Sequence, residues 1–146
     1  MMELTTFFTA DHRACDALWV EVEAAADAGM VDAAFSRFET FDATMRRHMD
    51  WEERGLFPAF EELTGMTSGP TMMMRAEHDQ MRALLEQMRA TEATRDVQML
   101  ADLGDTLLML IQQHNAKEEQ ILYPMAEQTL GPMWAALRSR LEEGKP

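Results

Sequence analysis

Six side chains of the sequence are of metal-ligand type and lie at related spacings. They include all four histidines of the chain and two glutamates, each four residues after a histidine: His12, His48, Glu52, His78, His114 and Glu118. Mixed imidazole and carboxylate donors suit iron, manganese or zinc, whereas a structural zinc site normally uses thiolates. The pattern therefore predicts a metal centre, with zinc or manganese open beside iron.

An internal repeat carries these residues. His12 and His78 are 66 positions apart, as are His48 and His114, and the glutamates obey the same offset. Pro58 and Pro124, each preceded by an aromatic residue, repeat with them. We therefore expect two halves, about 5–63 and 71–130, each contributing half of a pseudo-twofold site.

The interval between His48 and Glu52 suits one face of a helix. Four residues advance about 400°, which leaves the two side chains about 40° apart and one turn apart along the axis. Glu53 and Glu119 are rotated a further ~100°, so we expect them at the surface or behind the ligands, and not as ligands. Unpaired polar groups on an apolar face would each cost several kcal/mol, and bound metal ions remove that cost.

Apolar residues recur at helical spacing along most of the chain, and strand signals are nearly absent. We expect one helix up to about Gly29, a second over about 31–63 and a third through Met74 to a weak boundary near 91–95. A fourth helix should carry Ile121 on its inner stripe and end at Gly131. Residues 65–70 form the clear loop, and 133–141 a short tail helix. The fold class is thus all-α: an antiparallel up-down four-helix bundle with a short C-terminal fifth helix, as one domain over 1–146.

Further predictions concern the prolines, the methionines and two aromatic residues. Pro58 and Pro124 should kink their helices by deleting one i→i−4 hydrogen bond. The fifteen methionines, Met72–Met74 among them, are predicted as core filler and not as a copper site. Trp51 is assigned to the core in preference to the border of a pocket. The hydroxyl of Tyr123 is placed close enough to reach a bound exogenous ligand.

Composition excludes several classes of function. Thirteen basic and 26 acidic residues give a formal charge of −13, which argues against binding to nucleic acid or to anionic membranes. One cysteine, Cys15, excludes an intrachain disulfide.

No apolar run is long enough to span a bilayer and no signal peptide is visible, so a cytoplasmic location is expected. The sequence indicates no oligomeric state.

The composite pattern, His then His-x-x-x-Glu in both halves with aromatic-Pro tails, resembles the hemerythrin-like HHE cation-binding domains. The resemblance covers His12 to Pro124. It implies a non-haem di-iron centre with one iron bound by His12 and His48 and the other by His78 and His114. Glu52 and Glu118 would bridge the two irons, beside an oxo or hydroxo bridge.

One departure from that family bears on function. Oxygen-carrying hemerythrins have a fifth histidine on the third helix, but Met74 and Arg82 stand four residues before and after His78. The resulting open, symmetric site is similar to that of iron-sulphur-cluster repair proteins.

Three functions remain open at this stage. The first is binding of oxygen or nitric oxide for sensing or buffering. The second is a di-iron enzyme that reduces peroxide or nitric oxide, or an iron donor in cluster repair. The third is a metal-free interaction module. The catalytic residues, if there are any, are unknown.

Overall fold

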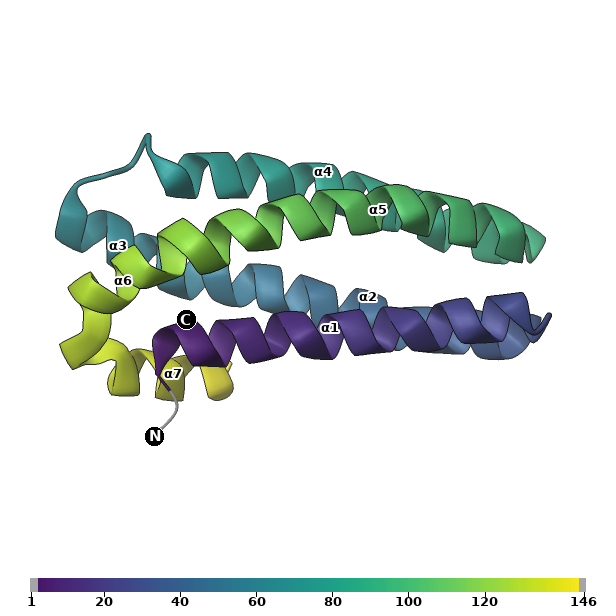
Figure 1. Ribbon diagram of the computed structural model, residues 1–146, viewed down its shortest axis with the longest axis horizontal. Coiled ribbons are helices and arrows are strands. Elements are labelled where there is room, and N and C mark those ends of the chain that lie inside the picture. The colour runs from purple at the N-terminus through teal and green to yellow at the C-terminus, as the bar shows by residue number, and fades with distance from the viewer. Residues whose placement is uncertain (1–2, 145–146) are drawn as a thin grey trace.

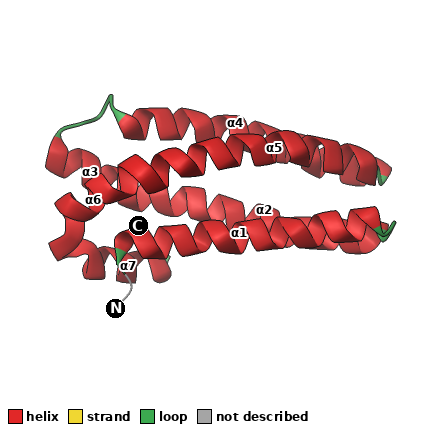
Figure 2. Cartoon of the chain, in the orientation of Figure 1, coloured by secondary structure: helices red, strands yellow, loops and turns green. Residues whose placement is uncertain are grey.

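Four long helices lie side by side along the length of the molecule (Figure 1). The computed structural model describes residues 3–144. The long helices are α1 (Leu4–Asp27), α2 (Val31–Trp51), α4 (Pro70–Ala90) and α5 (Val97–Lys117). The first two pack mainly against each other, as do α4 and α5. The all-α helical bundle is thereby confirmed, with no strand among the described residues (Figure 2), while its antiparallel course stays a prediction.

Three short helices gather at the end of the molecule where both termini lie (Figure 1). They are α3 (Phe57–Thr64), α6 (Tyr123–Leu130) and α7 (Trp134–Glu142), the last being the expected tail helix shifted by one residue. Residues 1, 2, 145 and 146 of the expected domain lie outside the described part. Within that part, every helix is too short or too polar to cross a membrane.

Local sequence signals explain where several of the helices begin or end. Gly29 and Gly65 have φ of 71° and 72°, a left-handed conformation that glycine adopts without strain after a helix. Asp96 caps α5 by accepting a hydrogen bond from the Met99 backbone amide at 3.0 Å. The third long helix begins at Pro70, before the first residue expected on its inner stripe, because proline fits the first turn of a helix.

A complete π-turn precedes each proline at which a kink is predicted. Residues Glu52–Leu56 (η1) and Glu118–Leu122 (η3) are π-helical, and the Phe57 amide donates to the carbonyl of Glu52, five residues back. Proline lacks an amide hydrogen and its ring clashes with the carbonyl four residues before it. A wider turn directly before each proline avoids that clash without breaking the helix.

The π-turns also correct one predicted core position. The regular helical stripe placed Ile121 on the inner face of the fourth helix, but its side chain is 55% exposed. Leu122 is buried in its place, as is Leu56 at the repeat-related position. A π-turn advances by a smaller angle per residue than an α-turn, so the inward position moves one residue along the chain.

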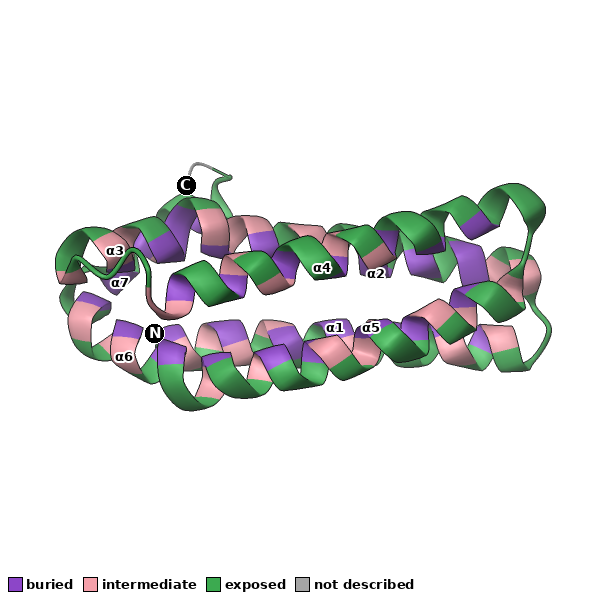
Figure 3. Cartoon of the chain, turned by 90° about the horizontal axis from the view of Figure 1, so that it is seen from above, coloured by how far each residue is buried: buried purple, intermediate pink, exposed green. Residues whose placement is uncertain are grey.

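Two apolar clusters fill the inner faces that Figure 3 shows as buried. The long-helix cluster comprises Cys15, Trp19, Val22, Phe35, Phe38, Phe41, Met45, Met49, Met81, Leu85, Met88, Leu100, Leu107 and Ile111. The end cluster comprises Leu4, Phe8, Leu56, Phe57, Phe60, Met74, Leu122, Tyr123, Ala126, Leu130, Trp134, Leu137 and Leu141. Along α1 the first cluster begins at Cys15 and the second ends at Phe8, so His12 lies between them.

Two expectations about apolar residues are only partly right. Trp51 is half-buried at the edge of the end cluster, and the guanidinium of Arg47 lies 4.6 Å from its ring centre. Many methionines are exposed and fill no core: Met30, Met66, Met72, Met73, Met99, Met109 and Met133. Of the run Met72–Met74, only Met74 is buried.

Close packing at Gly104 gives a test of the long-helix cluster. A Cβ atom at this position would lie 2.0 Å from Cζ2 of the buried Trp19. Gly104→Ala should therefore lower the free energy of unfolding by about 1–3 kcal/mol, as overpacking of a core does. At Gly131 nothing lies within 4 Å of such a Cβ, so Gly131→Ala should change it by less than about 0.5 kcal/mol. Urea unfolding of both variants decides; equal stability would contradict the packing described.

Candidate metal centre

The six predicted ligands come together between the two apolar clusters. Each is buried, with at most 4% of its surface exposed. They form two overlapping groups whose candidate ligand atoms lie within 4.8 Å of one another. One group is His12, His48 and Glu118; the other is Glu52, His78, His114 and Glu118. The two groups separate His12 and His48 from His78 and His114, the same division that the family resemblance implies.

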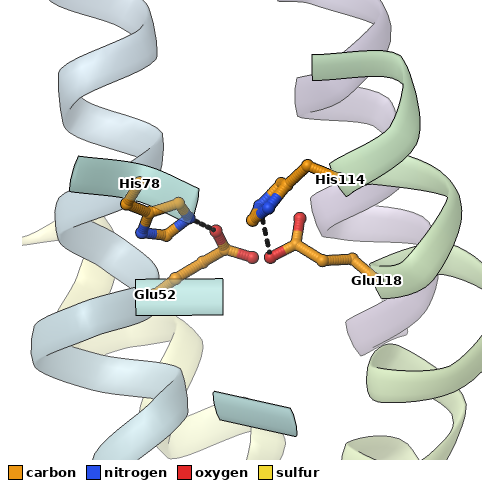
Figure 4. A group of neighbouring side chains, drawn as sticks. All are labelled: Glu52, His78, His114 and Glu118. Atoms are coloured by element: carbon orange, nitrogen blue, oxygen red, sulfur yellow. Dashed lines mark ion pairs between the residues drawn. The ribbon is translucent and has the colours of Figure 1, made fainter. Parts of the chain in front are cut away.

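Each glutamate faces one histidine of each pair. The Nε2 atom of His78 lies 3.1 Å from Glu52 Oε1, and that of His48 lies 3.5 Å from the same oxygen. On the other side, Glu118 Oε1 lies 3.0 Å from His12 Nε2, and its Oε2 lies 3.2 Å from His114 Nε2. Figure 4 shows the two carboxylates pointing toward each other from opposite helices. Two carboxylates placed in this way could each span a pair of ions.

Several candidate metal-ligand atoms of the cluster have no hydrogen-bond partner. Glu52 Oε1, His78 Nε2 and Glu118 Oε2 are buried without one, although the first two lie 3.1 Å apart. Leaving a buried polar atom unpaired costs about 1–3 kcal/mol, and more for a charged group. Lone pairs directed at the same place are what a cation requires, so the residues fit a metal centre.

The far side of every histidine ring binds a carboxylate. The Nδ1 atoms contact four acidic residues at 2.5–2.8 Å: Asp11 at His48, Glu53 at His78, Glu77 at His114 and Glu119 at His12. An ionised carboxylate only accepts, so each Nδ1 carries the hydrogen and donates it. The lone pair of a neutral ring is then on Nε2, which points into the cluster.

Each of these outer carboxylates in turn contacts a cation. The ion pairs are Arg47 with Asp11 at 3.4 Å, Arg82 with Glu53 at 2.9 Å, Lys117 with Glu77 at 2.5 Å and Arg13 with Glu119 at 3.0 Å. Four negative and four positive groups thus surround the histidines in balance. Arg82, which stands where a further ligand could have followed His78, is part of this ring.

Two of the outer carboxylates were missed from the sequence. Glu53 and Glu119 were expected at the surface or behind the ligands, and they lie behind the ligands. Asp11 and Glu77 were not singled out, although each directly precedes a histidine and the two are 66 positions apart. The internal repeat was therefore the signal that could have identified them.

The surrounding charges shift the pKa values of the cluster. Burial alone would lower the pKa of His48, but the charge of Glu52 and the hydrogen bond to Asp11 outweigh it and raise the pKa to about 10. The pKa of His78 is raised to about 9 against the effect of burial, by the neighbouring carboxylates of Glu52 and Glu53. Burial would raise the pKa of Glu52, yet the charge of His48 holds it well below its usual range. Without metal, protons on the imidazoles therefore balance the carboxylates.

A small cavity adjoins the four histidines on the side of the long-helix cluster. The space open to the centre of a water molecule is about 10 Å³. Besides the histidines, it is lined by three repeat-related pairs: Cys15 and Met81, Met45 and Ile111, Met49 and Asn115. It therefore lies where the two halves meet, and its walls are mostly apolar.

Tyr123 lies on the opposite side of the cluster, completely buried. Its hydroxyl is 2.6 Å from Glu52 Oε2 and 2.9 Å from Glu118 Oε1, and so donates its one hydrogen to either carboxylate. Burial, together with the charge of both glutamates, raises its pKa well above the usual value. Its ring stacks on Phe8, the repeat-related counterpart of Met74.

Comparison with known proteins agrees with this geometry. A family model described as the hemerythrin HHE cation binding domain matches residues 3–126. No curated protein and no solved structure matches the chain.

Replacing Glu53 tests the outer carboxylates. Glu53→Gln should weaken metal binding about tenfold to 100-fold, because His78 loses the anion that orients its ring. Glu62→Gln is the matched control, since Glu62 is exposed. Competition with a coloured chelator measures both affinities. Equal affinities in the two variants would show that the outer carboxylates do not support the metal.

The raised histidine pKa values predict how the metal-free protein responds to pH. A group whose pKa is raised by folding stabilises the fold below its unfolded pKa, about 6.5, and loses that effect as pH rises through the folded value. The Tm of the metal-free protein should therefore fall between pH 7 and the pKa values of about 9 and 10 for His78 and His48. Metal-loaded protein is the control, because the ion replaces the protons and the fall should be smaller. If the Tm falls equally with pH in the metal-free and the metal-loaded protein, the histidine protons do not stabilise the fold as described.

Proposed function

The chain belongs to the hemerythrin HHE cation-binding domain family, and we propose that it is a non-haem di-iron protein that binds a diatomic molecule, oxygen or nitric oxide. The family and the buried His/Glu cluster support metal binding. Imidazole and carboxylate donors suit iron, and they also accept zinc or manganese. Iron supplies the redox-active, ligand-binding chemistry that this function needs.

Within this proposal, the residues divide into terminal and bridging ligands. His12 and His48 hold one ion, His78 and His114 the other, and Glu52 and Glu118 span both. The contacts that support this division are those of each glutamate with one histidine of each pair, at 3.0–3.5 Å. The outer carboxylates keep every Nε2 directed inward, so the protein orients all four rings before an ion arrives.

The size and lining of the cavity favour a diatomic ligand, and this observation carries the proposal. About 10 Å³ open to the centre of a water molecule is room for roughly one small molecule. An organic substrate does not fit there. The apolar side chains of Met45, Met81 and Ile111 suit an uncharged gas better than an ion.

Binding is favoured over turnover because, apart from the histidines that would hold the metal, the cavity lining lacks a group that could move a proton. Burial raises the pKa of the Cys15 thiol to about 12, so it stays protonated at neutral pH. Asn115 does not titrate. Reduction of peroxide would require proton delivery, for which this wall offers no donor of suitable pKa. The burial of all six ligands likewise favours retention of iron over its donation to other proteins.

The test is to load the protein with iron, count the metal and add the ligands. We expect two ions per chain, and reversible optical changes with oxygen or nitric oxide under reducing conditions. Peroxide should be consumed slowly. One ion or none at full loading would contradict the di-iron proposal, and rapid peroxide consumption would favour an enzyme.

Filling the cavity separates ligand binding from metal binding. Ile111→Phe adds volume to the cavity wall and should weaken binding of nitric oxide by about tenfold or more, while two ions remain bound; about 1.4 kcal/mol corresponds to tenfold. Met109→Phe is the control on the same helix, since Met109 is 63% exposed. If both variants bind nitric oxide like the wild type, the ligand does not enter this cavity.

A further inference from the structure

One side chain breaks the twofold symmetry of the cluster. Tyr123 and Phe57 are repeat-related, 66 positions apart, and both are completely buried directly after a π-turn. The Phe57 ring stacks on His78, with ring centres 5.8 Å apart and planes at 19°. The Tyr123 ring is placed in the same way beside His12, with centres 5.6 Å apart and planes at 30°. The two halves therefore differ at this point by a single hydroxyl group.

That hydroxyl lies among candidate ligand atoms of His12, His48 and both glutamates. Its oxygen is 3.1 Å from His12 Nε2 and 3.4 Å from His48 Nε2. It is also 2.6 Å from Glu52 Oε2 and 2.9 Å from Glu118 Oε1. Four candidate ligand atoms thus surround it, two of them on histidines of the same pair.

These separations are those of neighbouring ligands on one ion. Two donor atoms about 2.1 Å from a metal, at a right angle to each other, lie about 3.0 Å apart. The His12 Nε2 and Glu118 Oε1 atoms are separated by 3.0 Å. The hydroxyl oxygen, at 2.6–3.4 Å from its four neighbours, has the place of a further ligand in the same set.

The second group has no such oxygen. Phe57, which occupies the equivalent place, carries no donor atom. The donors without hydrogen-bond partners, Glu52 Oε1, His78 Nε2 and Glu118 Oε2, all belong to the group that contains His78 and His114. With both glutamates shared between the ions, as proposed above, Tyr123 gives the first ion one more side-chain ligand than the second.

We propose that Tyr123 is a ligand of the ion held by His12 and His48, and that an exogenous ligand therefore binds at the ion held by His78 and His114. This inference rests on the proposed di-metal centre. When the ion binds, the O–H proton of Tyr123 passes to solvent and the phenolate oxygen coordinates. The positive ion reverses the effect of the nearby carboxylates, which in its absence oppose a negative charge on the oxygen.

Tyr123 is the single tyrosine of the chain, so its spectrum identifies it without mutation. Adding zinc to the metal-free wild type should produce the ultraviolet difference spectrum of tyrosinate. The ferric protein should show a visible phenolate-to-iron charge-transfer band. Protein that contains two ions per chain but gives neither signal would overturn the proposal.

A matched pair of variants tests which ion is open. Tyr123→Phe should lose both signals and bind two azide ions per centre, whereas the wild type binds one. The double variant Tyr123→Phe with Phe57→Tyr moves the hydroxyl to the other half, and should regain the charge-transfer band and bind one azide ion. Equal azide stoichiometry in the wild type and Tyr123→Phe would also overturn the proposal.

Metal analysis distinguishes this inference from the proposed function. If the wild type holds fewer than two ions, the di-metal centre fails and this inference fails with it. If it holds two ions without a tyrosinate signal, the centre stands and the role of Tyr123 is refuted. Should Tyr123→Phe fold poorly, the two spectra of the wild type still decide.

Discussion

The negative charge of two completely buried carboxylates, Glu52 and Glu118, is the constraint on which the arrangement around them depends. A buried carboxylate without compensation costs far more than a domain of this size can tolerate. The four outer carboxylates and their four cationic partners balance each other, so they cannot supply that compensation. It must come from within the ring of histidines, either as protons on the imidazoles or as metal ions. The raised pKa values of His48 and His78 indicate compensation by protons on the imidazoles. The inward Nε2 atoms are oriented for compensation by metal ions.

The helices place these charges through the π-turns. Each π-turn begins at a glutamate of the cluster and ends directly before the aromatic residue that precedes a proline. It therefore sets the register between the carboxylate, the outer acid that follows it and the aromatic ring below it. One π-turn sets the positions of Glu52, Glu53 and Phe57. The other sets those of Glu118, Glu119 and Tyr123. The difference between Phe57 and Tyr123 then decides how symmetric the centre is.

Much of this could be predicted because histidine and glutamate are conspicuous on an apolar helical stripe. The four helices and the place of Glu53 followed from spacing and from the repeat, whereas the pairing of the histidines followed from the resemblance to the hemerythrin-like domains. The π-turns did not follow, since a proline predicts a disturbed hydrogen bond but not how the backbone adapts, and Ile121 was misplaced for that reason. Asp11 and Glu77 were missed because acidic residues beside a helical stripe are usually solvated. Met72 and Met73 are exposed because they lie off the buried stripe of α4, which passes through Thr71, Met74 and His78, and composition alone does not show this.

The central claim is that two ions lie between the two histidine pairs and share the two glutamates. Anomalous diffraction from crystals of the iron-loaded protein tests it most directly. The account predicts two iron peaks about 3.5 Å apart, one beside the Nε2 atoms of His12 and His48, the other beside those of His78 and His114. A single peak, or iron bound among the outer carboxylates on the Nδ1 side, would contradict it.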